Sequence, residues 1–499
     1  MVCELLGAKQ LGVYFGNSLY AWSSVLGVTL GGLMIGYYLG GVLSSRKKDH
    51  LVLIVLAISG LLLAVMPSTG RWVMPIFLEK SVQTGSVLSL LIFMFPQLVL
   101  FGMTSPMIIN ILNQNSGRAG KMAGSVYAIS TLGGIISTFL MGFYLLPEFG
   151  VDLPAALFGL MLIAFSFIGL LRRKKYVAGA GAAVLILLIS AKLGVQKDPN
   201  SRKYKVVYSS DGILGQVKVI DQKFTTYTRG TKEARILYVN NTAQSIIDKE
   251  SPEYSLWDWS YYMPSAASVF PDNSDVLLLG LGGGTLVKQF QRLGFNVEAV
   301  ELDERIVEVT KKYFGVDPKL PLIIDDGRHF INTTTRKYDL IALDLFHSET
   351  PPSQMISIEA FKTMKTKLKK GGMILMNFYG YLTGDMGRSG RSVYRTFQAA
   401  GFDTKLLVTP GTEGGRNLIL LACTDEKDFS SSEYSEPGLP ALGDLTRHFV
   451  DPKTFNSEGA SILTDDVPAL EKMYLDCALE WRKGVNESFT KSFIREGIN

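Results

Sequence analysis

Cysteine and histidine are both scarce in this sequence of 499 residues. The three cysteines, Cys3, Cys423 and Cys477, lie far apart without metal-ligand spacing, so they form no disulfide framework and do not reveal the redox compartment. The presence of only four histidines argues against a histidine-rich metal site, and we expect no metal. The net charge of +5 is small and spread along the chain, so it gives no indication of a nucleic-acid partner.

Charged residues are rare in residues 1–195, which are almost continuously hydrophobic, whereas residues 196–499 have the mixed composition of a globular enzyme. A helix needs roughly 20 apolar residues to cross the ~30 Å hydrocarbon core of a bilayer. The first part therefore predicts a transmembrane helical domain, 1–195. The expected spans are 18–44, 50–68, 85–113, 121–147, 153–171 and 176–194.

This pattern predicts a multi-pass protein of the plasma or inner membrane, with the lipid bilayer as its partner. Cationic loops at 46–48 and 172–175 fall on one side of the bilayer if every span crosses, and the positive-inside rule makes that side cytoplasmic. Strict alternation would then put the globular part outside, away from cytosolic cofactors. The sequence does not decide on which side of the bilayer the globular part lies. Glycines such as Gly32 and Gly36 indicate close helix packing, with a substrate path as the alternative.

The globular part changes its periodicity along the chain. Residues 200–262 alternate in the manner of strands, with turn residues at Asp211-Gly212 and Asn240-Asn241, and predict a small β-hairpin domain. Residues 263–499 alternate strands with helices, one of them expected over 358–372, and predict an α/β doubly wound, methyltransferase-like Rossmann domain. Two segments after 403 predict an antiparallel pair that closes the sheet, and 427–445 predicts a polar loop.

Polar groups follow the strands of this predicted sheet. The apolar strand at 276–279 runs into the glycines Gly280, Gly282, Gly283 and Gly284, and the next strand ends on Glu301. Glycines let the backbone approach a ligand, and a carboxylate at the second strand end accepts hydrogen bonds from ribose hydroxyls. Thr285 stands where a dinucleotide fingerprint would have Gly or Ala, so a single adenosine cofactor fits better than NAD.

The later strands end on the Asp326-Gly327 pair and on Asp344. Ligands of such sheets bind at the carboxyl ends of the strands, so these groups are expected to converge with the glycine run.

With these motifs, in this order, residues 205–425 resemble the spermidine synthase (aminopropyltransferase) family. The hydrophobic first 200 residues and the ending ILTDDVPALE at 462–471 resemble the membrane-integrated, transporter-like fusions of that family. The resemblance implies transfer of an aminopropyl group from decarboxylated S-adenosylmethionine to a diamine, with release of methylthioadenosine.

The resemblance also implies residue roles. Gln216 and Gln244 resemble two glutamines near the donor, Glu301 the acid that binds its ribose, and Asp344 the proton acceptor. Asp326 and Gly327 resemble the Asp-Gly pair that flanks the adenine.

The sequence departs from the family at the acceptor side. The run Gly-Leu-Gly-Gly-Gly-Thr lacks the family's acid for the donor's amine and has Thr285 instead. The second aspartate of the gate motif is replaced by His347, and the segment TPGTEGG lacks the tyrosine that helps to bind putrescine. We therefore expect an acceptor other than ordinary putrescine, and either S-adenosylmethionine or its decarboxylated form as donor.

Each site residue has a structural alternative. Glu301 could be a surface acid, Asp326 a helix cap, and Asp344 a turn former, while His347 either shares the proton with Asp344 or is an exposed loop histidine. A set of aromatic side chains could line an acceptor pocket, lie at the bilayer interface or pack in the core. These are Trp257, Trp259, Tyr261 and Tyr262.

The sequence supports three functional hypotheses. The first is a membrane-anchored, aminopropyltransferase-like enzyme that acts on a small-molecule amine or a membrane-delivered acceptor, with a homodimer left open. The second is an S-adenosylmethionine-dependent methyltransferase on a membrane-delivered acceptor. The third is a transporter whose globular part senses an adenosine-type ligand without chemistry.

Overall fold

The computed structural model describes most of the chain, with gaps. Its described residues are 1–15, 19–45, 50–78, 80–113, 119–193, 204–212, 214–226, 228–346, 351–409, 414–451, 459–467 and 469–489. The chain divides into two compact units. The first holds Met1–Asp198 and Ser210–Gln216, and the second holds Pro199–Ser209 and Val217–Ile498.

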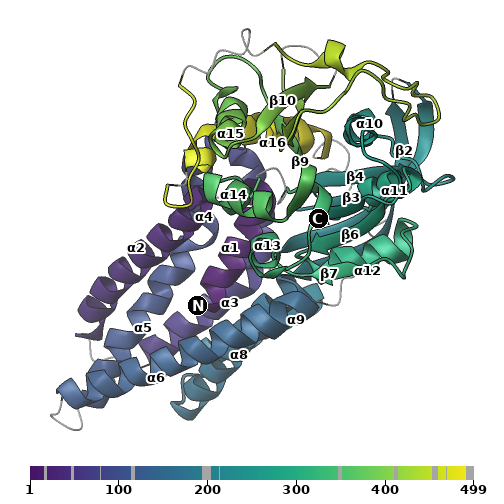
Figure 1. Ribbon diagram of the computed structural model, residues 1–499. Helices are drawn as coiled ribbons and strands as arrows, with labels where there is room; N and C mark the ends of the chain where they lie inside the picture. The colour runs from purple at the N-terminus through teal and green to yellow at the C-terminus, as the bar shows by residue number, and fades with distance from the viewer. Residues whose placement is uncertain are drawn as a thin grey trace. The chain divides into compact units, whose positions relative to one another are not determined.

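The first unit is a bundle of helices, coloured purple to blue in Figure 1. Five of its described helical segments are long and apolar enough to cross a membrane: Leu19–Ser44, Leu51–Phe77, Phe95–Asn113, Gly120–Leu145 and Asp152–Arg172. The helices are α1 (Val2–Phe15), α2 (Leu19–Ser44), α3 (Leu51–Val73), η1 (Met74–Phe77), α4 (Val82–Phe93), α5 (Phe95–Asn113), α6 (Ala119–Leu140), η2 (Met141–Leu145), α7 (Leu146–Phe149), α8 (Asp152–Arg172) and α9 (Tyr176–Leu193).

Two of the predicted spans differ from the structure. The span expected over 85–113 is wrong as a single helix, because α4 ends at Phe93 and α5 begins at Phe95. Pro96 has no N–H to continue the ladder, and its ring opposes the carbonyl four residues earlier, which explains the interruption. The span expected over 176–194 is the helix α9, which is not among the five membrane-length apolar helices of the described residues.

Glycines of α2 allow it to pack closely on α5. A Cβ on Gly36 would lie 2.3 Å from the carbonyl oxygen of Val99 and 2.8 Å from the Cα of Gly102, so only glycine fits. Gly32 and Gly40 face α5 in the same way. The packing interpretation therefore holds for this stripe, in agreement with the close approach that small residues permit between apolar helices.

A four-stranded sheet, in the order β1-β2-β3-β4, precedes the larger sheet in the sequence, and its strands β2, β3 and β4 pair antiparallel. Asn240 and Asn241, both at positive φ, form the tight turn between β3 and β4, as predicted. The strands are β1 (Tyr204–Gly212), β2 (Gly215–Thr226), β3 (Gly230–Val239) and β4 (Thr242–Asp248).

The larger sheet has the order β10-β11-β9-β8-β5-β6-β7. Strands β9, β8, β5, β6 and β7 run parallel, and β10 and β11 add the predicted antiparallel pair. The strands are β5 (Asp275–Leu279), β6 (Asn296–Glu301), β7 (Leu322–Ile324), β8 (Tyr338–Leu343), β9 (Leu368–Gly380), β10 (Asp403–Val408) and β11 (Arg416–Cys423).

Both faces of this sheet are buried, as a doubly wound fold requires. Leu277 and Leu279 of β5 join one hydrophobic core, while Val276 and Leu278 join the core on the opposite face. Tyr261 and Tyr262 also lie in the second core. Of the three alternatives for these aromatic residues (pocket lining, bilayer interface or core packing), core packing therefore holds for this pair. The methyltransferase-like Rossmann fold is confirmed.

Helices connect the strands and cover the sheet (Figure 1). The helix expected over 358–372 ends early, because α14 stops at Thr366 and β9 begins at Leu368. Gly371 has a φ of +75°, which a right-handed helix does not allow. The helices are η3 (Asp258–Tyr261), α10 (Tyr262–Ala267), α11 (Thr285–Arg292), α12 (Glu304–Tyr313), α13 (Gly327–Thr333), η4 (Ser353–Met355), α14 (Ile358–Thr366), α15 (Arg388–Ala399), η5 (Leu445–His448) and α16 (Ala469–Phe489).

Candidate active site

The glycine run forms a tight turn between β5 and α11. Gly280 has a φ of +91°, and a Cβ there would lie 2.3 Å from the carbonyl oxygen of Asp344. Gly284 has a φ of +71°, and its Cβ would lie 2.2 Å from Val316. Glycine is therefore required at both positions by conformation and by space. The turn brings the backbone that follows β5 against Asp344, the residue that directly follows β8.

Glu301 ends β6 beside this turn. Its Oε2 accepts a hydrogen bond of 3.0 Å from the backbone N–H of Leu281, and its Oε1 accepts one of 3.0 Å from that of Asp303. Burial raises the pKa of Glu301, and these N–H groups oppose that shift. Each oxygen keeps a further lone pair for a ligand hydroxyl. The carboxylate therefore has a fixed position at the strand ends, and its ribose role stays a prediction.

Asp326 caps the start of α13. Its Oδ1 accepts hydrogen bonds from the backbone N–H groups of Arg328 at 2.8 Å and of His329 at 3.1 Å, and Gly327 is the first residue of the helix. Asp326 is therefore a helix cap, which was the structural alternative to adenine binding. A contact of this pair with adenine stays a prediction.

Asp344 directly follows β8 and is held by an amide. The Nδ2 of Asn377 on β9 donates to Oδ1 of Asp344 at 2.9 Å, and the Nδ2 of Asn417 on β11 donates to Oδ1 of Asn377 at 2.9 Å. Burial raises the pKa of Asp344 to about 6, and the hydrogen bond from Asn377 acts in the opposite direction. A carboxylate with this pKa is ionised at neutral pH and is well matched to take a proton.

A pocket lies between the first half of β4, the segment 255–260, the glycine turn and the residue that follows β8. It holds about 290 Å³ of empty space, the solvent at its mouth included. Asp344 is the one carboxylate among the described residues of its wall. The lining residues are Gln244, Ser245, Ser255, Trp257, Trp259, Ser260, Leu281, Thr285, Leu286 and Asp344.

The pocket brings together some of the predicted site residues. Gln244 and Asp344 both line it, and Gly283 joins its wall through a hydrogen bond of 2.7 Å from its backbone N–H to Oγ of Ser245. Gly282 adjoins the same serine, because a Cβ there would lie 3.0 Å from Ser245 Oγ. Trp257 and Trp259 also line it, with ring centroids 6.2 Å apart.

Glu301, Asp326 and Gly327 are not among the residues that line this pocket, and two further predicted residues are not placed by it. Gln216 is the second residue of β2, and its donor contact stays a prediction. His347 lies outside the described residues, so its share in catalysis stays a prediction as well.

Sequence reasoning missed Asn377 and Asn417. Asn377 is 3% exposed in the middle of the apolar strand MILMNF, and a lone amide in such a strand is a signal that could have been used. Asn417 is likewise a lone amide, at the start of the apolar segment RNLILL. The pairing of Asn417 with Asn377, and of Asn377 with Asp344, could not be found in that way, because β8, β9 and β11 become neighbours only in the folded sheet.

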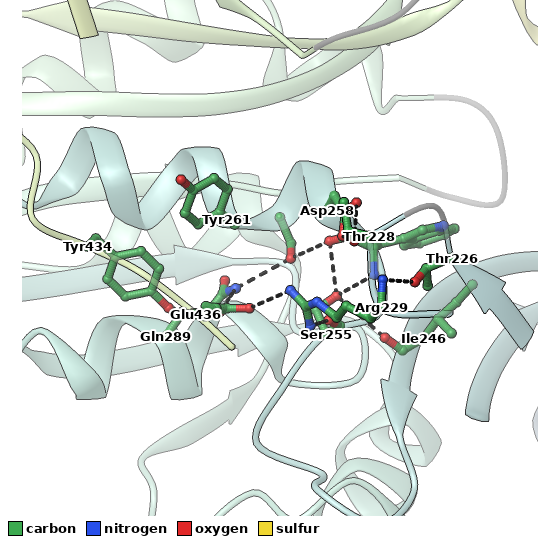
Figure 2. Close-up of polar contacts among 12 residues, drawn as sticks. Thr226, Thr228, Arg229, Ile246, Ser255, Asp258, Tyr261, Gln289, Tyr434 and Glu436 are labelled. Atoms are coloured by element: carbon green, nitrogen blue, oxygen red, sulfur yellow. Dashed lines mark hydrogen bonds and ion pairs between the residues drawn. The ribbon is translucent and has the colours of Figure 1, made fainter. Parts of the chain in front are cut away.

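A buried ionic network supports the wall of the pocket (Figure 2). Glu436, from the loop that was predicted to be polar, receives hydrogen bonds from Arg292 at 2.6 Å, from Gln289 at 2.7 Å and from Arg229 at 3.3 Å. Arg229 also donates to the carbonyl oxygen of Ser255 at 2.5 Å. The loop is thus tied to the turn before β3, to α11 and to a residue of the pocket wall.

Comparison with known proteins finds similar sequences. Residues 262–379 match the family model of the spermine/spermidine synthase domain. Polyamine aminopropyltransferase 2 of Aquifex aeolicus is 23% identical over 457 residues, which cover 87% of each chain. An alignment of that length extends into the helical unit, because it is longer than the second unit.

Other relatives match over shorter regions. The probable polyamine aminopropyl transferase of Bifidobacterium longum is 33% identical over 115 residues, 22% of this chain and 26% of that protein. The polyamine aminopropyltransferase of Thermoplasma volcanium is 30% identical over 159 residues, 30% of this chain and 55% of that protein. A probable spermidine synthase structure from Corynebacterium glutamicum has a TM-score of 0.40 at 19% identity and covers 54% of this chain and 98% of its own.

The fold of the second unit is that of a methyltransferase-like α/β domain. Residues 262–379 match a spermine/spermidine synthase domain, and the curated relatives support a transferase of the polyamine synthase type.

Proposed function

We propose that this protein moves an aminopropyl-type group from an S-adenosylmethionine-type donor to an amine other than putrescine, at a membrane. The observation that carries the proposal is Asp344, the one carboxylate among the described residues of the pocket, held by Asn377 beside the glycine turn. The donor is S-adenosylmethionine or its decarboxylated form.

The chemistry needs a base and a closed pocket. The neutral amine of the acceptor attacks the donor carbon next to the sulfonium, a new C–N bond forms, and the C–S bond breaks with its electron pair passing to sulfur. Methylthioadenosine leaves. The amine becomes more acidic as the bond forms, and Asp344 takes its proton and then passes it to water, which is general-base work worth roughly 10²–10⁴-fold.

The pocket favours an acceptor with a single cation. Putrescine is a dication, and a charge left unpaired in a closed pocket costs several kcal/mol. Asp344 can pair with one ammonium group, whereas the remaining described walls offer hydroxyls, an amide, leucines and the indoles of Trp257 and Trp259. An amine with an apolar or aromatic body would match these walls better than a second ammonium group.

The membrane part of the proposal rests on the helical unit. Five apolar helices are long enough to cross a bilayer by length and composition. They would hold the transferase at the membrane surface, where a membrane-delivered amine could reach it.

Mass spectrometry of the adenosine product tests the reaction. The full-length protein is incubated in detergent micelles with each donor and a panel of primary amines that includes putrescine. Methylthioadenosine supports the proposal, whereas S-adenosylhomocysteine would establish methyl transfer. Donor binding without turnover on any amine would favour a ligand sensor, and efficient use of putrescine would contradict the acceptor assignment.

A further inference from the structure

The first turn of α11 forms part of the pocket wall and lacks a partner for its donors. The backbone N–H groups of Thr285, Leu286 and Val287 have no acceptor within the described part of the chain. The N-cap residue is Gly284, which has no side chain to accept from them. Unpaired N–H groups at a helix start carry the positive end of the helix dipole and attract an anion.

Thr285 adds a second donor at the same place. Its side chain lines the pocket, the residue is only 8% exposed, and its Oγ1 has no hydrogen-bond partner in the described structure. A buried hydroxyl without a partner is costly, and a ligand that accepts its hydrogen bond removes that cost. The hydroxyl and the helix start therefore favour the same kind of ligand group.

The charges of α11 have the same sign as this helix start. Its sequence TLVKQFQR contains no acid, and both of its charged residues, Lys288 and Arg292, are cationic. In the described structure the buried Glu436 pairs with Arg292, and burial lowers the pKa of Lys288, which Glu253 and Glu436 act to raise. An ammonium group at the start of α11 would thus meet a positive end of a helix with no acid in its first turn, whereas a carboxylate would be stabilised there.

We propose that the start of α11, with Thr285, binds the carboxylate of an amino-acid group on the donor, so that the donor is intact S-adenosylmethionine. The inference rests on the proposed function and specifies its donor. Asp344 lines the same pocket and serves the acceptor amine as its base.

The transferred group follows from this donor. The acceptor nitrogen bonds to the donor carbon next to sulfur, the C–S bond breaks with its electron pair on sulfur, and methylthioadenosine leaves. The amine loses a proton to Asp344 and then to water. The product keeps the donor's carboxylate and ammonium, so the acceptor gains an aminocarboxypropyl group instead of an aminopropyl group.

Calorimetry with the two donors tests the carboxylate site on full-length protein in detergent. We expect the wild type to bind S-adenosylmethionine at least about tenfold more tightly than its decarboxylated form. Thr285→Asp puts a carboxylate where the donor's carboxylate would lie, and should reverse that order. An acid is well tolerated in the first turn of a helix, so this variant should fold.

Two neutral variants control for shape. Thr285→Asn is close to Thr285→Asp in size without the charge, and should keep the preference for the intact donor. Thr285→Val removes only the hydroxyl, and should weaken the intact donor more than the decarboxylated one. Equal or tighter binding of the decarboxylated donor by the wild type, or an unchanged order in Thr285→Asp, would overturn the assignment.

Product analysis separates this inference from the proposed function. Methylthioadenosine together with a carboxylate-bearing acceptor product, formed from the intact donor, supports both. Methylthioadenosine from the decarboxylated donor alone rejects the carboxylate site and leaves the proposed function standing. Absence of methylthioadenosine with both donors and the whole amine panel rejects the proposed function.

Discussion

Asn377 donates a hydrogen bond of 2.9 Å from its Nδ2 to the Oδ1 of Asp344, across the neighbouring strands β8 and β9. The orientation of Asn377 is itself set by Asn417, which donates to its Oδ1 at 2.9 Å. The relay gives the carboxylate a defined position and partly offsets the rise in its pKa that burial causes. It makes Asn377 a positioning residue for the proposed base.

Removal of this amide should shift the pH profile. A donor to a carboxylate favours its charged form, so Asn377→Ala should raise the pKa of Asp344 further above about 6. The acidic limb of kcat/KM should move to higher pH, with a loss of about tenfold near neutrality that alkaline pH partly restores. Asn296→Ala, at the amino end of β6, is the control and should leave the profile unchanged. A profile for Asn377→Ala identical to that of the wild type would reject the relay.

Replacement of the base should separate turnover from donor binding. Asp344→Asn is nearly isosteric but cannot take the proton, so turnover on the true acceptor should fall roughly 10²-fold or more. Donor affinity by calorimetry should change little, because the ribose and adenine groups are untouched. In the wild type, turnover should also fall as the pH drops below about 6, since protonated Asp344 is no base. A near-normal rate for Asp344→Asn would remove Asp344 from the mechanism.

The ribose assignment can be tested at Glu301. Glu301→Gln replaces one carboxylate oxygen by an NH₂ group, which cannot accept from both Leu281 and Asp303. We expect donor affinity to fall by about tenfold or more, measured by calorimetry. Glu304→Gln, at the exposed start of α12, serves as the control. Equal donor affinities for Glu301→Gln and Glu304→Gln would contradict the ribose role.

The buried network around Glu436 should matter for stability. Glu436→Gln leaves Arg229 and Arg292 without their buried anion, and breaking such a pair typically costs roughly 3–5 kcal/mol. The loss is measured by thermal unfolding of the full chain. Glu433→Gln, exposed on the same loop, should have little effect. Equal unfolding midpoints for the two variants would show that the network adds no net stability.

Membrane topology can be tested by cysteine labelling. The loop charges predict that positions 47 and 174 share the cytoplasmic side, so cysteines there should resist an impermeant thiol reagent in intact cells, while one at 149 should react. The native cysteines Cys3, Cys423 and Cys477 are buried and should give little background. The opposite labelling pattern would invert the model. A cysteine at 430 then reports the side of the catalytic unit.

Much of the fold could be predicted from local patterns. The apolar strand, the glycine turn and the acid at the next strand end follow from residues adjacent in sequence, because periodicity and glycine conformation are local properties. The boundaries were harder to predict. The helix expected over 358–372 and the single span over 85–113 were wrong, because Gly371 and Pro96 act through backbone geometry that an apolar or charged pattern does not show.

The sequence by itself determined which groups stand at the strand ends: the glycines of 280–284, Glu301, Asp326 and Asp344. Only the tertiary structure decided their surroundings. Strand order brings Asn377 and Asn417 to Asp344, β4 brings Ser245 to the glycine turn, and the loop of Glu436 folds back on α11. These contacts join residues 33 to 147 positions apart, and such pairings follow from packing and burial of the whole sheet, which no local pattern specifies.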